Sequence, residues 1–374
     1  MIYLDNAATS YPKPMQVARS MYSCVKNCYG SYGRGAHAGS MQAMDIVFKA
    51  RSMLANILHV DHAENIVMTN NATMALNIAI CGMVGRDDHV ITTHLEHNSV
   101  MRPLIAQKAS VSYLPQNEDG SSNIAALNKY ILPQTKLVII NHASNVSGLI
   151  NDIYLAGEIC AKFGAPLLID ASQTMGVIPV DAGRLNGMVA FPGHKGLMGP
   201  QGSGGLYIPP GYALSPVISG GTGSLSESFD QPEQLPDRFE SGTIGIPAIA
   251  GLISGMQHIQ DSDMKNIYTY EMILCSKLIA GLKEIPGVSI LLSDNMRRVP
   301  TVSFNIDGKD CSAASEILSE QHEICTRSGL HCAPAAHKAY GTFETGTLRL
   351  SPGYFNTTEE IETALRAVRE IART

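Results

Sequence analysis

The fold is indicated most directly by residues 188–202, which read MVAFPGHKGLMGPQG. The first residues form a short apolar run, typical of a strand that is buried on both faces. A glycine-dense loop follows and carries a single lysine, Lys195. Glycines let the backbone approach a ligand closely, and partial burial of a lysine favours the neutral amine that covalent chemistry requires. This stretch therefore predicts a buried strand that ends in a ligand-binding lysine loop.

Two common phosphate sites do not fit this loop. A nucleotide phosphate loop needs Gly-Lys-Ser/Thr at the start of a helix, and Lys195 is followed by Gly196 and Leu197. A nicotinamide site needs a GxGxxG turn after the first strand of the sheet, and the sequence has none there.

Similar apolar runs recur between helical stretches on both sides of this loop. The runs lie at residues 66–68, 90–92, 137–140, 167–169, 188–190 and 205–208. Short β-branched runs that alternate with helices are typical of a largely parallel α/β sheet. We therefore expect an α/β fold for this half of the chain.

The pattern changes after about residue 255. Residues 301–306 alternate with period 2, and helical patterns cover 262–284, 312–321 and the chain from about 358. This mixture favours a smaller α+β domain. We predict a large domain at 13–260 and a small domain made of 1–12 and 261–374. The Gly/Ser/Pro-rich residues 219–236 are expected to form a long surface loop.

Composition narrows the function classes. The 374 residues are 45% hydrophobic and carry 27 basic and 33 acidic side chains without a long run of one sign. This balance favours a globular protein and argues against nucleic-acid or anionic-membrane partners. The start of the chain lacks a signal peptide and no stretch is apolar enough to span a bilayer, so we expect a soluble cytoplasmic protein.

Eight cysteines are scattered without CxxC pairs, which predicts reduced thiols. Buried free cysteine is the common outcome, and we expect it for Cys81, Cys160 and Cys275. No His/Cys/Asp/Glu spacing predicts a metal site.

Polar residues follow two of the predicted strands. Residues 69–73, TNNAT, open a helix and offer backbone N–H groups and hydroxyls to an anion, although an ordinary capped helix has the same pattern. Asp170 ends the fully apolar run 167–169. A carboxylate there needs a cation or a hydrogen-bond donor. A protonated pyridine nitrogen suits it; a metal ion or a helix cap is the alternative.

Taken in this order, the segments 69–73, 167–173 and 191–202 resemble the class V aminotransferase family of fold-type-I pyridoxal-phosphate enzymes. Within that family the chain resembles the cysteine desulfurases of the group that includes selenocysteine lyases. The resemblance runs from residues 3–9, YLDNAAT, to residues 354–357, YFNT. It implies a PLP-dependent transferase fold of type I, with the cofactor in the large domain and a catalytic cysteine loop in the small domain.

The resemblance assigns cofactor roles to several residues. Lys195 matches the lysine that binds the cofactor covalently, Asp170 the partner of the pyridine nitrogen and Gln173 the donor to the ring hydroxyl. His97 matches the histidine that stacks on the ring and moves protons. Thr243 matches a residue that the second subunit gives to the phosphate, which implies a homodimer. The phosphate cradle is matched by Asn71, Ala72, Thr73 and His194.

Three further residues concern the substrate. Asn145 and Arg349 match groups that hold an amino-acid carboxylate, for which an arginine fork is well suited. Without the resemblance, a surface salt-bridge residue is the alternative for Arg349, since surface arginines are common. Cys332, in the loop 328–334 near Arg327, matches the catalytic thiol, and a nucleophilic thiol needs partial exposure and nearby positive charge.

The resemblance implies a cysteine desulfurase, which converts L-cysteine to L-alanine and takes the sulfur on Cys332 as a persulfide for an acceptor protein. L-selenocysteine, or another small amino acid in an aminotransferase reaction, is the alternative substrate. Two departures bear on this. Pro192 replaces a phosphate-binding serine, so the cradle depends more on its other members. Leu330 replaces a second histidine, which is expected to make the site less polar.

Overall fold

The computed structural model describes residues 1–28, 30–33, 35–292 and 296–373. The strands are β1 Ile2–Tyr3, β2 Ile66–Thr69, β3 His89–Thr92, β4 Ser110–Tyr113, β5 Thr135–Asn141, β6 Leu167–Asp170, β7 Met188–Pro192, β8 Gly204–Tyr207, β9 Val288–Ile290, β10 Val302–Ile306, β11 Ile324–Cys325, β12 Arg327–Gly329 and β13 Thr347–Leu350. The α-helices are α1 Met15–Asn27, α2 Ala38–Leu58, α3 Ala72–Met83, α4 Asn98–Gln107, α5 Leu127–Tyr130, α6 Ile153–Phe163, α7 Ala182–Leu185, α8 Ile246–Ser262, α9 Met264–Lys283, α10 Cys311–His322, α11 Pro334–Ala339 and α12 Thr358–Arg373.

A seven-stranded sheet forms the centre of the larger part, in the order β2-β8-β7-β6-β5-β3-β4. Strand β8 runs antiparallel to both of its neighbours, and the other pairings are parallel. The predicted α/β fold with a mostly parallel sheet is confirmed. Each of the six predicted apolar runs lies within, or within one residue of, one of these strands.

The apolar runs form strands because both faces of the sheet are covered. Alternate residues of a strand point to opposite faces. Val138 and Ile140 of β5 therefore join a core with α2, α6 and α8, whereas Leu137 and Ile139 join a core with α3 and α4. A strand buried in this way has no polar face, which explains the unbroken apolar runs.

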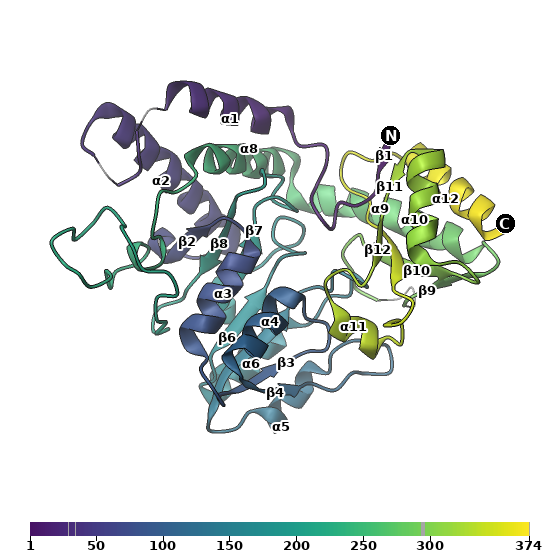
Figure 1. The fold of residues 1–374 in the computed structure, drawn as a ribbon, viewed down its shortest axis with the longest axis horizontal. Helices are drawn as coiled ribbons and strands as arrows, with labels where there is room; N and C mark the ends of the chain where they lie inside the picture. The colour runs from purple at the N-terminus through teal and green to yellow at the C-terminus, as the bar shows by residue number, and fades with distance from the viewer. Residues whose placement is uncertain (29, 34, 293–295, 374) are drawn as a thin grey trace.

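The smaller part has its own sheet and its own core. Strands β12, β13, β10 and β9 pair antiparallel, and α9, α10 and α12 pack on them. The N-terminal strand β1 pairs in parallel with β11, and Leu4 enters this core, so the start of the chain lies beside α10 and α12 (Figure 1). The predicted domain boundary at residue 260 stays a proposal. It is supported by the smaller part having a hydrophobic core separate from those of the larger part.

Two surface features complete the fold. Residues 219–236 form no helix or strand and are mostly exposed, with Phe229 fully exposed.

Cys160 and Cys275 are buried as expected, but the prediction for Cys81 was wrong. Cys81 is half-buried because it lies on α3 next to Asn77, with Sγ 3.8 Å from Oδ1. None of the helices in the described ranges has the length and hydropathy required to cross a membrane.

Candidate active site

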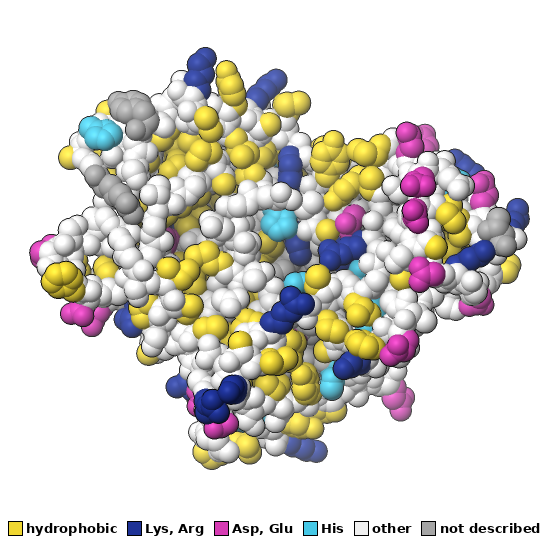
Figure 2. All heavy atoms as spheres, viewed as in Figure 1, with side chains coloured by type: hydrophobic (Ala, Val, Ile, Leu, Met, Phe, Trp, Pro, Cys, Tyr) yellow, Lys and Arg dark blue, Asp and Glu magenta, His cyan; other side chains and the backbone are white. Residues whose placement is uncertain are grey.

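The site lies where the strands of the large sheet end, at the seam with the smaller part. A pocket of about 850 Å³ opens there. In Figure 2, Lys, Arg and His side chains gather near the centre of the face that is shown, between the two parts of the molecule. All but one of the predicted site residues line the pocket: Asn71, Ala72, Thr73, His97, Asn145, Asp170, Gln173, His194, Lys195, Cys332 and Arg349.

The loop after β7 holds Lys195 in place. A Cβ atom at Gly193 would lie 2.1 Å from Oγ of Ser203, so only glycine fits there. Lys195 is partly exposed to the pocket. Burial of its amine lowers the pKa to about 8, although the charge of Asp170 acts in the opposite direction. About a tenth of the amine is therefore neutral at pH 7, far more than for an ordinary lysine, and the neutral form is what a nucleophile or a base requires.

The N-terminal segment is hydrogen-bonded to this loop. The carbonyl oxygen of His194 accepts hydrogen bonds from Thr9 Oγ1 at 3.0 Å and Lys13 Nζ at 2.6 Å. Ser10 Oγ donates to the carbonyl of Lys195 at 2.9 Å. The segment thus connects the lysine loop to the smaller part, in which the first residues of the chain pack.

Asp170 is the last residue of β6 and is 5% exposed. Its Oδ1 accepts hydrogen bonds from the backbone N–H of Ser172 at 2.9 Å and from the Ser172 hydroxyl at 2.5 Å. These bonds orient the carboxylate at the pocket wall. A buried carboxylate is stable when a cation or a strong donor faces it, which a protonated ring nitrogen supplies. Beside it, Gln173 donates from Nε2 to the carbonyl of Ala7 at 3.1 Å.

His97 caps the N-terminus of α4. Its Nδ1 accepts the backbone N–H of Ser99 at 3.0 Å, so in the neutral ring the proton is on Nε2. Burial lowers the pKa of His97 to about 4, against the attraction of Asp170. At neutral pH the ring is therefore uncharged, and its flat face can pack against an aromatic ring.

The N-terminus of α3 faces the pocket. Asn71 caps this helix by accepting the N–H of Met74 at 2.9 Å, and the hydroxyl of Thr73 lies 2.8 Å from that of Ser99. Nδ1 of His194 is buried without a hydrogen-bond partner among the described residues. Free helix N–H groups, a hydroxyl and an unused imidazole nitrogen fit an anion such as a phosphate. With Asp170 opposite, the pocket fits a planar cationic ring that carries an anionic arm.

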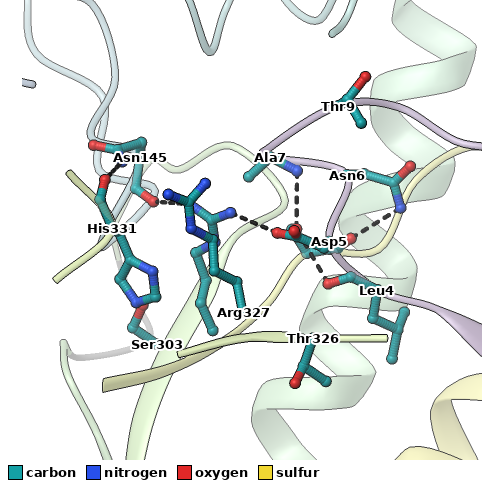
Figure 3. Close-up of polar contacts among 12 residues, drawn as sticks. Leu4, Asp5, Asn6, Ala7, Thr9, Asn145, Ser303, Thr326, Arg327 and His331 are labelled. Carbon is teal, nitrogen blue, oxygen red and sulfur yellow. Dashed lines mark hydrogen bonds and ion pairs between the residues drawn. The ribbon is translucent and has the colours of Figure 1, made fainter. Parts of the chain in front are cut away.

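Arg349, on β13, is 1% exposed and lies in a polar network. Figure 3 labels Asp5, Asn145 and His331 of this network. Its Nη1 donates to the carbonyl of Asn145 at 2.9 Å, and its Nη2 lies 2.6 Å from Oδ1 of Asp5. Nε is buried without a partner among the described residues. Asn145 also donates from Nδ2 to the carbonyl of His331 at 2.7 Å. Arg349 also lines the pocket, where its guanidinium group can meet a substrate carboxylate.

Cys332 is the exposed thiol among the eight cysteines. Nη2 of Arg327 lies 3.4 Å from its Sγ, so a cation faces the sulfur. Both His331 and Cys332 adopt positive φ, 48° and 58°, and the carbonyl of Cys332 accepts the N–H of Asn98 at 2.7 Å. That bond holds the turn in a costly conformation and fixes the thiol at the pocket mouth.

Thr243 is the predicted site residue that the fold does not bring into this pocket. It is exposed and lines a separate hollow with Thr69 and Asn70, outside the N-terminus of α3. Of the two departures, Pro192 lines the pocket, whereas Leu330 is half-buried and does not. Leu330 therefore leaves the polarity of the pocket wall unchanged.

Sequence reasoning missed two residues that support the site. Asp5 holds Arg349, although the two are 344 positions apart. The only sign of this was that Asp5 belongs to the motif 3–9. Ser99 orients His97 through a local cap, which the pattern His-x-Ser at a helix start could have indicated.

Comparison with known proteins gives the family. The family model described as aminotransferase class V matches residues 2–364. A "probable cysteine desulfurase" of Methanothermobacter thermautotrophicus is 33% identical over 381 residues, which cover 99% of this chain and 94% of the relative. Another from Pyrococcus abyssi is 32% identical and covers 100% and 94%.

Solved structures agree with these relatives. The cysteine desulfurase of Thermococcus onnurineus superimposes with a TM-score of 0.91 at 30% identity, over 100% of this chain and 94% of that one. A cysteine desulfurase from Escherichia coli, described as an S-sulfonic acid form, gives 0.89 at 25% identity, over 99% and 94%.

Proposed function

Because the chain belongs to the class V aminotransferase family, we propose that it is a pyridoxal-phosphate-dependent cysteine desulfurase that releases L-alanine from L-cysteine. One observation carries the proposal. The exposed thiol of Cys332, with Arg327 beside it, lines the same pocket as Lys195 and Arg349. An aminotransferase needs the lysine and the arginine but has no use for a thiol in this position.

The residues that would hold the cofactor are those of the large part. Lys195, Asp170 and His97 line the pocket, where Lys195 would anchor the cofactor covalently, Asp170 would pair with its ring nitrogen and His97 would pack on its ring. The start of α3, with Thr73 and His194, receives the phosphate. When bound, the cofactor withdraws electrons from the Cα atom of an amino acid, which makes its proton acidic.

The protein then positions the substrate and moves protons. Arg349 binds the substrate carboxylate with help from Asn145, and this orients the Cα–H bond. Once the substrate amine has displaced Lys195 from the cofactor, the free Lys195 amine, whose pKa is lowered to about 8, would take the Cα proton as a general base. Neutral His97 offers its Nε2–H as a hydrogen-bond donor on the other side of the substrate from Lys195.

Cys332 receives the sulfur. Its thiolate, stabilised by the guanidinium of Arg327, attacks the substrate sulfur. A sulfur–sulfur bond forms as the carbon–sulfur bond breaks, and the electron pair of that bond stays with the carbon fragment, which is released as alanine after protonation. The outer sulfur atom of the persulfide on Cys332 then passes to an acceptor protein.

A homodimer is part of the proposal. Thr243 is exposed and reaches no group in the pocket of its own chain. Apolar side chains are exposed on α1 and α2, and hydrophobic groups gather over α1 in Figure 2. An exposed apolar surface of this kind marks a protein interface. The patch consists of Met15, Tyr22, Val25, Met41, Met44 and Phe48. Its burial between two copies is the arrangement in which Thr243 serves the partner's phosphate site.

L-Selenocysteine is the second candidate substrate, and the cytoplasm remains the predicted location, which eight unpaired cysteines favour. The test incubates the purified holoenzyme with L-cysteine or L-selenocysteine and measures alanine together with sulfide or selenide. We expect alanine from L-cysteine with wild type and none with Lys195→Ala. Full alanine production by Cys332→Ser, or transamination without sulfide, would assign the chain to another reaction of the family.

A further inference from the structure

A second pocket lies on the other side of Lys195. It is partly open to solvent and shares Ala7, Gln173 and Lys195 with the first pocket. Its remaining walls come from both parts of the chain, including the start of α9 and residues 352–355 before α12. It is a distinct concave space at the seam, and the proposed reaction leaves it unused.

The walls of this pocket are mainly apolar. Val177 and Met198 come from the large part, Ile267 from α9, and Pro300 and Phe355 from the smaller part. Small-molecule sites have this character: apolar walls with a few polar groups that fix the ligand's orientation.

Glu271, on α9, is the acidic group in this pocket. It is only 7% exposed, yet no ion pair joins it to any other described residue. Burial raises the pKa of Glu271 to about 8, against a hydrogen bond from the backbone of Tyr354. A buried carboxyl group without a cation is costly for a fold unless it gains a partner.

We propose that this second pocket binds a small organic cation, a protonated amine on an apolar body, with the ammonium group against Glu271. The carboxyl group supplies the specificity, because it can ionise to give an ammonium ion a charged partner, which a neutral or anionic ligand does not gain. The apolar body packs between Ile267 and Phe355. This site is separate from the proposed catalytic pocket and does not depend on the desulfurase reaction.

Binding of a cation is coupled to proton release. At pH 7 a carboxyl group with a pKa of about 8 is roughly nine-tenths protonated, and pairing with an ammonium ion ionises it. The proton passes to the solvent. The titratable groups that surround Glu271 are Lys195 and Tyr354 in the pocket, Tyr268 and Cys275 on α9, and His258 of α8, whose ring packs on Tyr354.

The test is titration calorimetry of the holoenzyme with N,N-dimethylbenzylamine. This tertiary amine is a cation at pH 7 and cannot condense with the cofactor's carbonyl. Measurements in two buffers of different ionisation enthalpy give the protons released per ligand. We expect saturable binding of one ligand, with about 0.9 proton released at pH 7 and less than about half a proton at pH 8, where the amine is still mostly a cation.

Three variants make the result specific. Glu271→Gln is expected to weaken binding by at least about tenfold and to abolish proton release, since the charged pair is lost. Phe355→Ala, at a partly exposed wall position, should weaken binding several-fold and leave the proton count unchanged. Glu320→Gln, an exposed carboxyl group on α10, should change neither.

The neutral analogue benzyl alcohol separates the walls from the carboxyl group. It should bind more weakly, without proton release and equally to wild type and Glu271→Gln. Absence of saturable amine binding, amine binding without proton release at pH 7, or equal amine affinity in Glu271→Gln would each overturn the proposal. If Glu271→Gln does not fold, an unchanged affinity in Phe355→Ala overturns it instead.

Discussion

Oδ1 of Asp5 and Nη2 of Arg349 lie 2.6 Å apart, which joins the first residues of the chain to the arginine that is proposed to bind the substrate carboxylate. Arg349 is 1% exposed, and burial lowers its pKa against the opposing charge of Asp5. The same N-terminal segment bonds to the carbonyl groups of His194 and Lys195. One short segment therefore spans both ends of the proposed reaction site.

Loss of the Asp5 carboxylate should impair substrate binding more than chemistry. In Asp5→Ala the guanidinium of Arg349 loses one of its two acceptors, and we expect KM for L-cysteine to rise about tenfold with kcat changed less than about threefold. Asp5→Asn keeps an oxygen acceptor and should lie between wild type and Asp5→Ala. Steady-state kinetics test this, with Asp307→Asn at an exposed site as the control. Unchanged KM in Asp5→Ala would show that Arg349 needs no anchor.

Thr243→Ala should loosen the cofactor across a dimer interface. One hydrogen bond to a charged phosphate contributes about 1 to 2 kcal/mol, so the Kd for pyridoxal phosphate should rise roughly tenfold. Equilibrium dialysis of the variant measures this, and Thr269→Ala on the exposed face of α9 is the matched control. If Thr243→Ala sediments as a monomer and still retains the cofactor as tightly as wild type, the dimer arrangement is contradicted.

Glu96 should make the protein less stable as the pH rises. It is fully buried, and burial raises its pKa from 4.5 to about 8. Its contribution is therefore fully present below pH 4.5 and is lost as the pH rises to about 8. Glu271 acts in the same direction, whereas Lys13 and Lys195, with pKa values lowered to about 8, add stability only at higher pH.

The experiment follows chemical unfolding midpoints between pH 6.5 and 8. Wild type should lose stability over this interval, and Glu96→Gln should lose less because its amide does not ionise. Glu320→Gln serves as the exposed control. An identical slope in Glu96→Gln and wild type would mean that Glu96 is already ionised in the folded protein.

Much of the fold and most of the pocket were predictable from the sequence, for physical reasons that particular residues show. Apolar runs such as 137–140 predict strands because both faces of the sheet are covered by helices. Asp170 was recognisable because it directly follows such a run and is chemically out of place there, and Lys195 because it lies in a glycine-dense loop shortly after one. Parallel strands then bring their carboxyl ends to one edge, which places these residues together.

The remaining features depend on contacts between distant segments. No local pattern pairs Asp5 with Arg349 or places Glu271 in a pocket, because each depends on how the smaller part docks against the sheet. Two-residue strands such as β1 and β11 form only because segments far apart in the sequence pair with each other, and they are too short to show a period. The exposure of Cys81 likewise depends on which face of α3 the sheet covers.

Cys332→Ser should separate two chalcogen substrates. Sulfur leaves carbon reluctantly and needs a nucleophile to accept it, so the variant should form no alanine from L-cysteine. The carbon–selenium bond is weaker, and selenium can leave without help, so appreciable activity on L-selenocysteine should remain. A paired assay of wild type and variant that follows alanine decides between them. Equal losses on both substrates would mean that selenium also needs the thiol.

The most direct test of the account is to trap the sulfur on the enzyme. The holoenzyme is incubated with L-cysteine without reductant, alkylated, digested and analysed by mass spectrometry. The account predicts alanine in a single turnover and one additional sulfur atom on the peptide that carries Cys332, absent from Cys332→Ser. Alanine formed at the wild-type rate with no added sulfur on Cys332, or sulfur found on another cysteine in its place, would contradict it.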